Sequence, residues 1–155
     1  ISGALFLLVG LVYDRAHTRE IAQYGGLVHR MPVFAVLFML FTMANVGLPG
    51  TSGFVGEILT MVGGFQASTW AAAGAALGVI FSAVYMLTLY RRTVFGSLTE
   101  KLPVPMAEMD DVTTREMVSP VTLALLVILL GVKPGLVFDI TEASSLRVLE
   151  MMAGG

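Results

Sequence analysis

Long apolar segments separated by short polar ones organise this chain. A helix that crosses a bilayer needs about 20 apolar residues, because each residue advances about 1.5 Å along the axis. The run from Met31 to Phe65 is the longest, and Glu57 is its only Asp, Glu, Lys or Arg. We therefore predict an all-α fold, a polytopic transmembrane helix bundle with one discontinuous (broken) helix, forming a single membrane domain. Its segments are a partial span 1–13, a loop 14–30, a broken span 31–66, a span 67–90, a loop 91–116, a span 117–138 and a tail 139–155.

The break in the long run is predicted from residues that do not sustain a helix. Proline lacks the amide hydrogen that the helix needs, and glycine is a poor helix former. Non-helical backbone at membrane depth is tolerated only where protein buries it or where it lines a cavity. Thr51 or Ser52 is expected to cap the helix that resumes after the break. The residues that predict the break are Gly47, Pro49, Gly50 and Gly53.

Residues 31–66 allow two topologies, a hairpin of two short spans or a single crossing made of two half-helices. A single crossing puts the loops 14–30 and 91–116 on one side of the membrane, with seven of the nine Lys and Arg residues. A hairpin divides those seven between the two sides. Because Lys and Arg concentrate in cytoplasmic loops, the charges favour the single broken crossing, with both loops in the cytoplasm or its mitochondrial equivalent. The seven are Arg15, Arg19, Arg30, Arg91, Arg92, Lys101 and Arg115, and the other two are Lys133 and Arg147.

Glu57 is the candidate functional residue, because ionisable groups within hydrocarbon are costly and usually face a bundle interior or a water-filled path. The amides at the start of the second half-helix carry partial positive charge, which favours the ionised acid, whereas burial favours the neutral acid. We therefore expect Glu57 to gain and lose a proton. The alternative is a packing acid that pairs with a cation on another helix.

Composition excludes several classes of protein. With 56% hydrophobic and 13% charged residues and a mean hydropathy of +0.85, the chain is too apolar for an ordinary soluble domain. Its net charge of -2 offers no basic surface for nucleic acid, and the absence of cysteine excludes thiolate-bound metals and disulfides. His17 and His29 lie in a polar loop, where we expect no metal site. The chain starts inside an apolar run without Met, so we interpret it as the C-terminal part of a longer subunit.

Four short stretches resemble one family of respiratory proteins, the chain 4 (bacterial chain M) family of NADH-quinone oxidoreductase, respiratory complex I. They are Tyr-Asp-Arg-Ala-His-Thr-Arg-Glu-Ile at 13–21, Gly-Gly-Leu at 25–27, Met-Pro at 31–32, and Gly-Leu-Pro-Gly-Thr-Ser-Gly-Phe-Val-Gly-Glu at 47–57. The resemblance covers essentially all 155 residues. The glycine-proline break alone is also similar to the wider family that includes the Mrp-type cation/proton antiporters.

The resemblance implies a proton-translocating subunit of the membrane arm, in which Glu57 belongs to an intramembrane proton relay that couples NADH-to-quinone electron transfer to proton pumping. The other relay residues of that family precede Ile1. Its partners would be other membrane-arm subunits, lipid and protons, with flavin and iron-sulfur clusters held by other subunits and no cofactor in this chain. The expected location is the bacterial inner membrane or the mitochondrial inner membrane. Two alternatives stay open, a subunit of an Mrp-type antiporter and a structural membrane subunit without a proton path.

Overall fold

The computed structural model describes residues 1–97, 104–105 and 108–153, and within them all regular structure is helical. Lys101 of the predicted positive loop lies outside these residues. Within the described residues, six α-helices and two short 3-10 turns follow one another. They are α1 (Ser2–Ala16), η1 (Ile21–Gln23), η2 (Leu27–His29), α2 (Pro32–Asn45), α3 (Ser52–Ala67), α4 (Thr69–Thr93), α5 (Thr114–Val132) and α6 (Gly135–Ala153).

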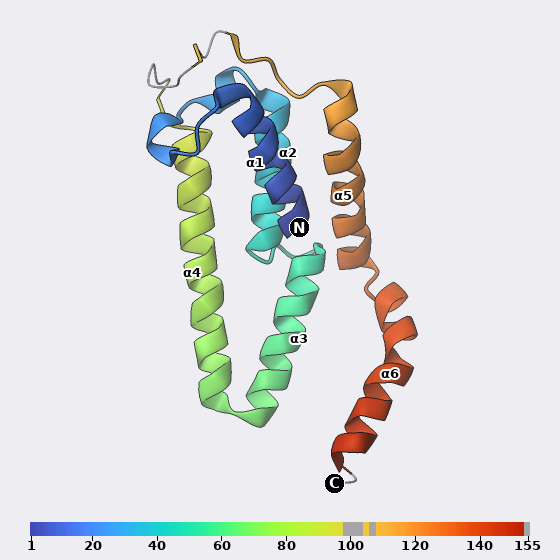
Figure 1. Ribbon diagram of the computed structural model, residues 1–155. Coiled ribbons are helices and arrows are strands. Elements are labelled where there is room, and N and C mark those ends of the chain that lie inside the picture. The colour runs from blue at the N-terminus through green and yellow to red at the C-terminus, as the bar shows by residue number, and fades with distance from the viewer. Residues whose placement is uncertain (98–103, 106–107, 154–155) are drawn as a thin grey trace.

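Helix α4 runs the whole height of the bundle, whereas α2 and α3 share that height between them (Figure 1). The α2 helix descends to the middle of the bundle, and α3 continues downward from there to the short turn that begins α4. The α1 and α5 helices pack beside α2 in the upper half. Helix α6 extends away from the lower end of α5, and its described side chains from Leu136 to Met151 are exposed.

Two helices, α4 and α5, are long and apolar enough to cross a membrane. Only 6% of the most apolar window of α4 and 17% of that of α5 is buried inside the structure. A soluble protein would bury such helices, so their apolar outer surface is the surface that lipid or neighbouring transmembrane helices would cover. Trp70, 87% exposed at the start of α4, is typical of a residue at a membrane interface.

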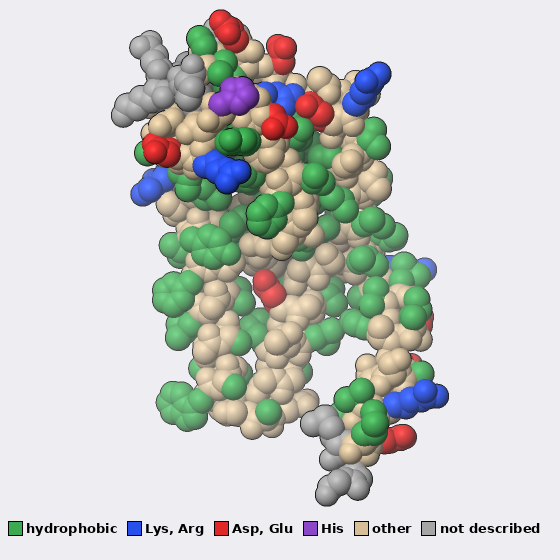
Figure 2. Space-filling model, in the orientation of Figure 1, with side chains coloured by type: hydrophobic (Ala, Val, Ile, Leu, Met, Phe, Trp, Pro, Cys, Tyr) green, Lys and Arg blue, Asp and Glu red, His purple; other side chains and the backbone are tan. Residues whose placement is uncertain are grey.

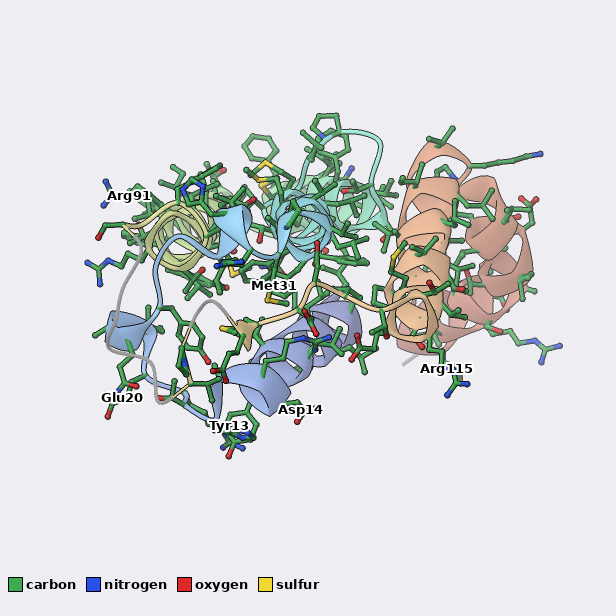
Figure 3. All side chains as sticks on the ribbon, turned by 90° about the horizontal axis from the view of Figure 1, so that it is seen from above. Tyr13, Asp14, Glu20, Met31, Arg91 and Arg115 are labelled. Carbon is green, nitrogen blue, oxygen red and sulfur yellow. The ribbon has the colours of Figure 1, made fainter. Side chains whose placement is uncertain are left out.

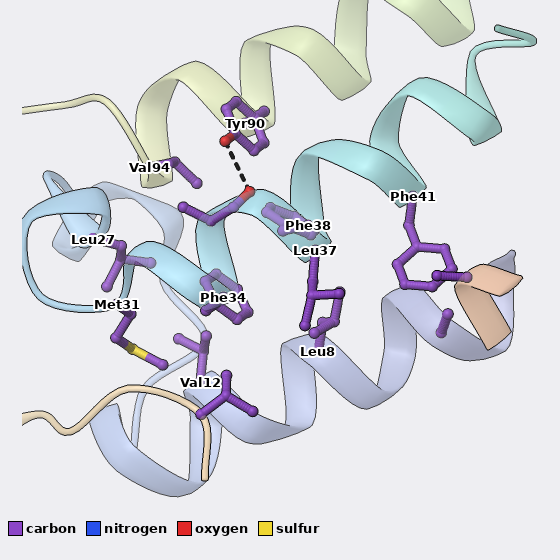
Figure 4. Close-up of a cluster of buried hydrophobic side chains, with 14 of the residues drawn as sticks. Leu8, Val12, Leu27, Met31, Phe34, Leu37, Phe38, Phe41, Tyr90 and Val94 are labelled. Carbon is purple, nitrogen blue, oxygen red and sulfur yellow. Dashed lines mark hydrogen bonds between the residues drawn. The ribbon is translucent and has the colours of Figure 1, made fainter. Parts of the chain in front are cut away.

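The packed core lies between α1 and α2, with the upper end of α4 closing one side (Figure 4). Phe34 stacks on Phe38 with ring centroids 5.4 Å apart, and Phe38 lies 5.7 Å from the ring of Tyr90. The Tyr90 hydroxyl donates a hydrogen bond of 3.0 Å to the backbone carbonyl of Ala35. Close packing and this polar contact hold α2 to α4, as expected where lipid tails supply no hydrophobic drive between helices.

The connection from α1 to α2 and the described part of the connection from α4 to α5 lie at the same end of the bundle (Figure 1). Charged side chains gather at this end, and the middle of the bundle is mostly uncharged (Figure 2). Seen from above, Asp14, Glu20, Arg91 and Arg115 lie around the periphery, and the buried Met31 lies near the centre (Figure 3). The charged end is therefore a polar cap over an apolar body.

A single arginine ties this end together. The guanidinium of Arg15, on the last turn of α1, forms a 2.7 Å ion pair with Glu116 on the first turn of α5. It also donates to the backbone carbonyls of Leu11, Asp110 and Asp111, at 3.0, 2.9 and 3.3 Å. Because the Arg15 side chain is only 15% exposed, these are partly desolvated, charge-assisted hydrogen bonds.

Asp111 caps helix α2 from a distant part of the sequence. Its carboxylate accepts hydrogen bonds from the amides of Val33 and Phe34, at 2.8 and 3.1 Å, and from the amide of Val112 at 2.7 Å. An acidic group at a helix N-terminus satisfies free amides and complements the helix dipole. The connection between α4 and α5 is thus bound to the entrance of α2.

Several helix bounds differ from the predicted segments. Helix α4 continues to Thr93, whereas the sequence predicted a span that ends at residue 90. Helix α1 continues past residue 13 and ends at Ala16, where His17 adopts the left-handed conformation with φ 53°. Helix α5 begins at Thr114 because Thr113 and Glu116 form a capping box, so Pro120 lies in its second turn. It ends at Val132, and Pro134 separates it from α6, whereas the sequence predicted a span to residue 138.

Candidate functional site

Residues 46–51, between α2 and α3, are called the interruption below. Helix α2 ends there in a Schellman motif, in which the amides of Gly47 and Leu48 donate to the carbonyls of Ala44 and Met43, at 3.3 and 3.0 Å. Gly47 occupies the left-handed position with φ 85°, which glycine adopts without steric cost. Pro49 follows and stops the helix from continuing. Local chemistry at Gly47 and Pro49 thus ends α2 halfway through the bundle.

Thr51 occupies the N-cap position of α3 but does not cap it in the expected way. Its hydroxyl donates back to the carbonyl of Leu48 at 2.7 Å, and its amide donates to the same carbonyl at 3.1 Å. Among the residues that the structure describes, no side chain caps α3 by a hydrogen bond. The expectation that Thr51 or Ser52 caps this helix is therefore wrong, because the Thr51 hydroxyl instead closes the turn behind it.

The first turn of α3 packs tightly against the last turn of α2. A Cβ at Gly53 would overlap the carbonyl oxygen of Ala44 and lie 3.1 Å from the Ile1 side chain. Gly53 therefore contributes by its small size, whereas Gly50, with φ 91° and open space around its Cα, contributes by its backbone conformation. Between α2 and α3, Gly47 thus supplies a left-handed helix end, Gly50 a second left-handed turn and Gly53 a close helix contact, with Pro49 between the two turns.

Glu57 reaches back from the second turn of α3 to the end of α2. Its carboxylate lies against Gly47: a Cβ at Gly47 would overlap Oε2 and lie 3.1 Å from Cδ. The side chain is partly buried, and within residues 1–97, 104–105 and 108–153 no hydrogen bond or ion pair engages it. The carboxylate thus lies beside the carboxyl end of α2, which carries partial negative charge, and in the second turn of α3, whose amino end carries partial positive charge.

A hollow of about 430 Å³ opens beside Glu57. The start of α1, the end of α2, the first turns of α3 and the middle of α4 all contribute to its wall. Hydroxyl and amide side chains among them supply donors and acceptors that can hold water close to the carboxylate. The lining residues are Ile1, Ser2, Ala44, Asn45, Ser52, Gly53, Gly56, Glu57, Thr60, Met61, Ala75 and Val79.

Sequence reasoning missed the polar neighbours of Glu57 in this hollow, above all Asn45 and Thr60. The signal for Thr60 was present, because it lies three residues after Glu57, on the same side of a helix. His17 and His29 are exposed at the charged end, away from the hollow. The part of the chain that the structure describes has no group of three or more His, Asp or Glu residues placed to hold a metal ion.

Comparison with known proteins places the chain. Residues 1–84 match the family model described as NADH:quinone oxidoreductase/Mrp antiporter, TM. The NADH-quinone oxidoreductase subunit M of Rhodobacter capsulatus is 57% identical over 150 residues, which are 97% of this chain and 29% of that protein. The chain belongs to the NADH:quinone oxidoreductase/Mrp antiporter transmembrane family. The resemblance read from the sequence is thereby confirmed, and the protein is a membrane protein of the antiporter-like class.

Further relatives extend the same picture. The NADH-ubiquinone oxidoreductase chain 4 of Chondrus crispus is 40% identical over 153 residues, which are 99% of this chain and 30% of that protein. A chain of the structure of respiratory complex I from Thermus thermophilus with bound NADH superposes with a TM-score of 0.75 at 40% identity, over 84% of this chain and 26% of that one. The chain spans about three tenths of the length of these relatives.

The Mrp complex from Dietzia sp. DQ12-45-1b shares the fold, with a TM-score of 0.70 over 88% of this chain and 33% of that one. The identity is only 22%, so this likeness speaks for the fold alone. Sequence identity therefore places the chain with the complex I subunits within the wider family.

Proposed function

We propose that this chain is part of a proton-translocating subunit in the membrane arm of NADH-quinone oxidoreductase, and that Glu57 exchanges the proton. The membership of the family and the 57% identity to a subunit M support the assignment to NADH-quinone oxidoreductase. The single observation that supports the residue is the position of Glu57, the only acid between Arg30 and Arg91, against the interruption and beside a mostly apolar hollow that also holds a few hydroxyl and amide side chains. In this proposal, electron transfer and its flavin and iron-sulfur clusters belong to other subunits.

The interruption gives such an acid a means of coupling. Two helix ends of opposite partial charge meet at the carboxylate, so any shift of one end relative to the other changes the field that it experiences. A proton that arrives or leaves changes the force on the same two ends. Half-helix ends at membrane depth serve ion sites in many transporters for this reason. We infer that proton exchange at Glu57 and small movements of the interruption are linked.

The topology that follows is a single crossing. We propose that α2, the interruption and α3 together span the membrane once, because α3 continues from α2 toward the opposite end of the bundle (Figure 1). The two charged connections then lie together on the cytoplasmic side of a bacterial inner membrane, or on the equivalent side of the mitochondrial one, as their arginines favour. Glu57 lies near the middle of that crossing.

The experiment is Glu57→Gln in the full-length subunit, within the assembled complex in vesicles. Glutamine keeps the size and polarity of the side chain but does not ionise, so it cannot take up or release the proton. We expect normal assembly on a native gel, with NADH-driven proton pumping and quinone reduction lowered together. The matched control is Glu142→Gln, the same change at an exposed position of α6, which should leave both rates unchanged. Normal pumping by an assembled Glu57→Gln complex would refute the role of Glu57, and lost assembly would favour a structural role.

A second candidate is a subunit of an Mrp-type cation/proton antiporter, because the family model that matches residues 1–84 includes Mrp antiporters in its description. The two functions differ in what drives the proton. An antiporter exchanges protons for sodium without NADH, so vesicles that contain the subunit without the redox arm should show sodium-dependent proton flux. A complex I subunit should show none under those conditions, and proton movement should require electron transfer.

A further inference from the structure

The last turn of α5 meets the interruption at Gly131. A Cβ at this position would overlap the carbonyl oxygen of Gly50 and the Cα and carbonyl carbon of Thr51. All three are backbone atoms, so no rotation of a side chain could relieve the overlap. Only glycine lets α5 approach the Gly50–Thr51 peptide this closely.

This contact continues a buried face of α5. Pro120, Ala124 and Val127 are buried at helical spacing along the same helix, and Gly131 is the next position on that face. Thr51 on the other side of the contact is only 5% exposed. The α5 helix therefore packs closely against the interruption, at the level where α2 ends (Figure 1).

The contact between Gly131 and the Gly50–Thr51 peptide is connected to Glu57 through two hydrogen bonds of Thr51 and through the first turns of α3. The amide and the hydroxyl of Thr51 both bind the carbonyl of Leu48, whose own amide binds the carbonyl of Met43 on α2. On the other side, Thr51 leads directly into α3, which carries Glu57 six residues later. A displacement of the Gly50–Thr51 peptide thus moves the start of α3 relative to Gly47, against which the Glu57 carboxylate lies.

We propose that Gly131 is a positioning residue, which lets α5 seat on the interruption and so fixes the Glu57 carboxylate against Gly47. The proposal deepens the proposed function and rests on it for its consequence in pumping. Its geometric part, the position of Glu57, stands apart from pumping and is measured separately.

The test compares Gly131→Ala with Gly78→Ala in the assembled full-length complex. Both changes add one methyl group to a transmembrane helix, but a Cβ at Gly78 has no atom within 4 Å in this chain. The first readout is the rate at which dicyclohexylcarbodiimide, an apolar reagent for carboxyl groups, modifies Glu57, followed by mass spectrometry of the peptide. The second readout is NADH-driven proton pumping.

We expect Gly131→Ala to speed the labelling of Glu57, because the displaced carboxylate turns further into the hollow. We also expect it to lower pumping, by up to about 100-fold if the carboxylate moves by about 1 Å. Gly78→Ala should match the wild type in both readouts. Labelling of the Gly131→Ala complex at the wild-type rate overturns the proposal, whatever happens to pumping. If Glu57→Gln pumps normally while Gly131→Ala still alters labelling, the proposed function fails and the positioning role stands.

A second pair of variants decides the matter if Gly131→Ala does not assemble. Thr51→Val keeps the shape of the side chain but removes its hydrogen bond to Leu48, whereas Thr51→Ser keeps the hydroxyl. If the contact of Gly131 with the Gly50–Thr51 peptide positions Glu57, Thr51→Val speeds the labelling of Glu57 and Thr51→Ser does not. Equal labelling in both variants overturns the proposal.

Discussion

Carboxylates occur in two contrasting settings in this protein, at the charged end of the bundle and at the interruption halfway along it. At the charged end, Asp111 accepts three backbone amides, and Glu116 holds the guanidinium of Arg15 and the N-cap of its own helix. At the interruption, Glu57 rests against the backbone of Gly47 with no such partner among the described residues. The first two acids hold helices together, whereas the third makes no such contact among the described residues.

The difference teaches how to separate the two roles by mutation. An acid with many partners should matter mainly for stability, since removing it leaves buried donors unsatisfied. An acid without partners should matter little for stability and much for function. Four predictions are given in order of decreasing loss of stability. In each, stability is measured as the temperature at which half of the assembled complex loses this subunit on a native gel.

The largest loss is expected for Gly47→Ala. Alanine pays the cost of a left-handed backbone, and its methyl group overlaps the Glu57 carboxylate, so we expect a destabilisation of about 2–5 kcal/mol. Gly50→Ala is the control, because it has a similar φ but open space around it, and should cost only about 1–2 kcal/mol. Adding Glu57→Ala to Gly47→Ala should recover part of the loss. An equal loss at Gly47 and Gly50 would show that the carboxylate does not lie where the structure has it.

Arg15→Ala should come next, at about 2–3 kcal/mol, because it leaves Glu116 and the carbonyls of Asp110 and Asp111 without their shared donor. Arg15→Lys sharpens the test. Lysine keeps the charge but lacks the planar fork that reaches several acceptors, so it should recover only part of the loss. Full recovery by lysine would mean that charge alone, without the fork, holds α1 to α5.

Asp111→Ala should cost about 1–2 kcal/mol, the usual value of a helix N-cap. Val33 and Phe34 donate to different oxygens of the carboxylate, so Asp111→Asn keeps an acceptor for only one of the two amides and should recover only part of this loss. If both variants melt like the wild type, the connection between α4 and α5 contributes nothing to the start of α2.

Glu57→Gln should have the smallest effect, within about 0.5 kcal/mol of the wild type, because no described partner is lost. The same variant is expected to have the largest effect on proton pumping. A stability loss as large as that of Arg15→Ala would place Glu57 with the structural acids and end the contrast between the two regions.

Much of the interruption could be predicted from the sequence, because its chemistry is local. Gly47 and Pro49 end a helix through their own backbone, whatever surrounds them. The capping box at Thr113 and Glu116 was equally local and was overlooked, although a threonine followed three residues later by glutamate is its known signature. The role of Glu57 stays a prediction.

The contacts of the charged end could not have been predicted in the same way. Arg15 and Glu116 are 101 positions apart, and Asp111 is 78 positions from Val33. A single sequence contains no signal that joins such distant positions, and an acidic cluster in a polar loop looks the same whether it is solvated or caps a helix. The contact of Gly131 with the interruption could not be predicted for the same reason, since a glycine near a helix end has many local explanations.

The bond between the Tyr90 hydroxyl and the Ala35 carbonyl gives the protein a built-in spectroscopic reporter. A helical carbonyl that accepts a second hydrogen bond has a weakened C=O bond and vibrates at a lower frequency than its neighbours along α2. An isotope label at the carbonyl of Ala35 alone would isolate that infrared band, and Tyr90→Phe would return it to the frequency of an ordinary helix. The band would then record, during turnover and without any bulky probe, whether the upper half of α2 stays attached to α4.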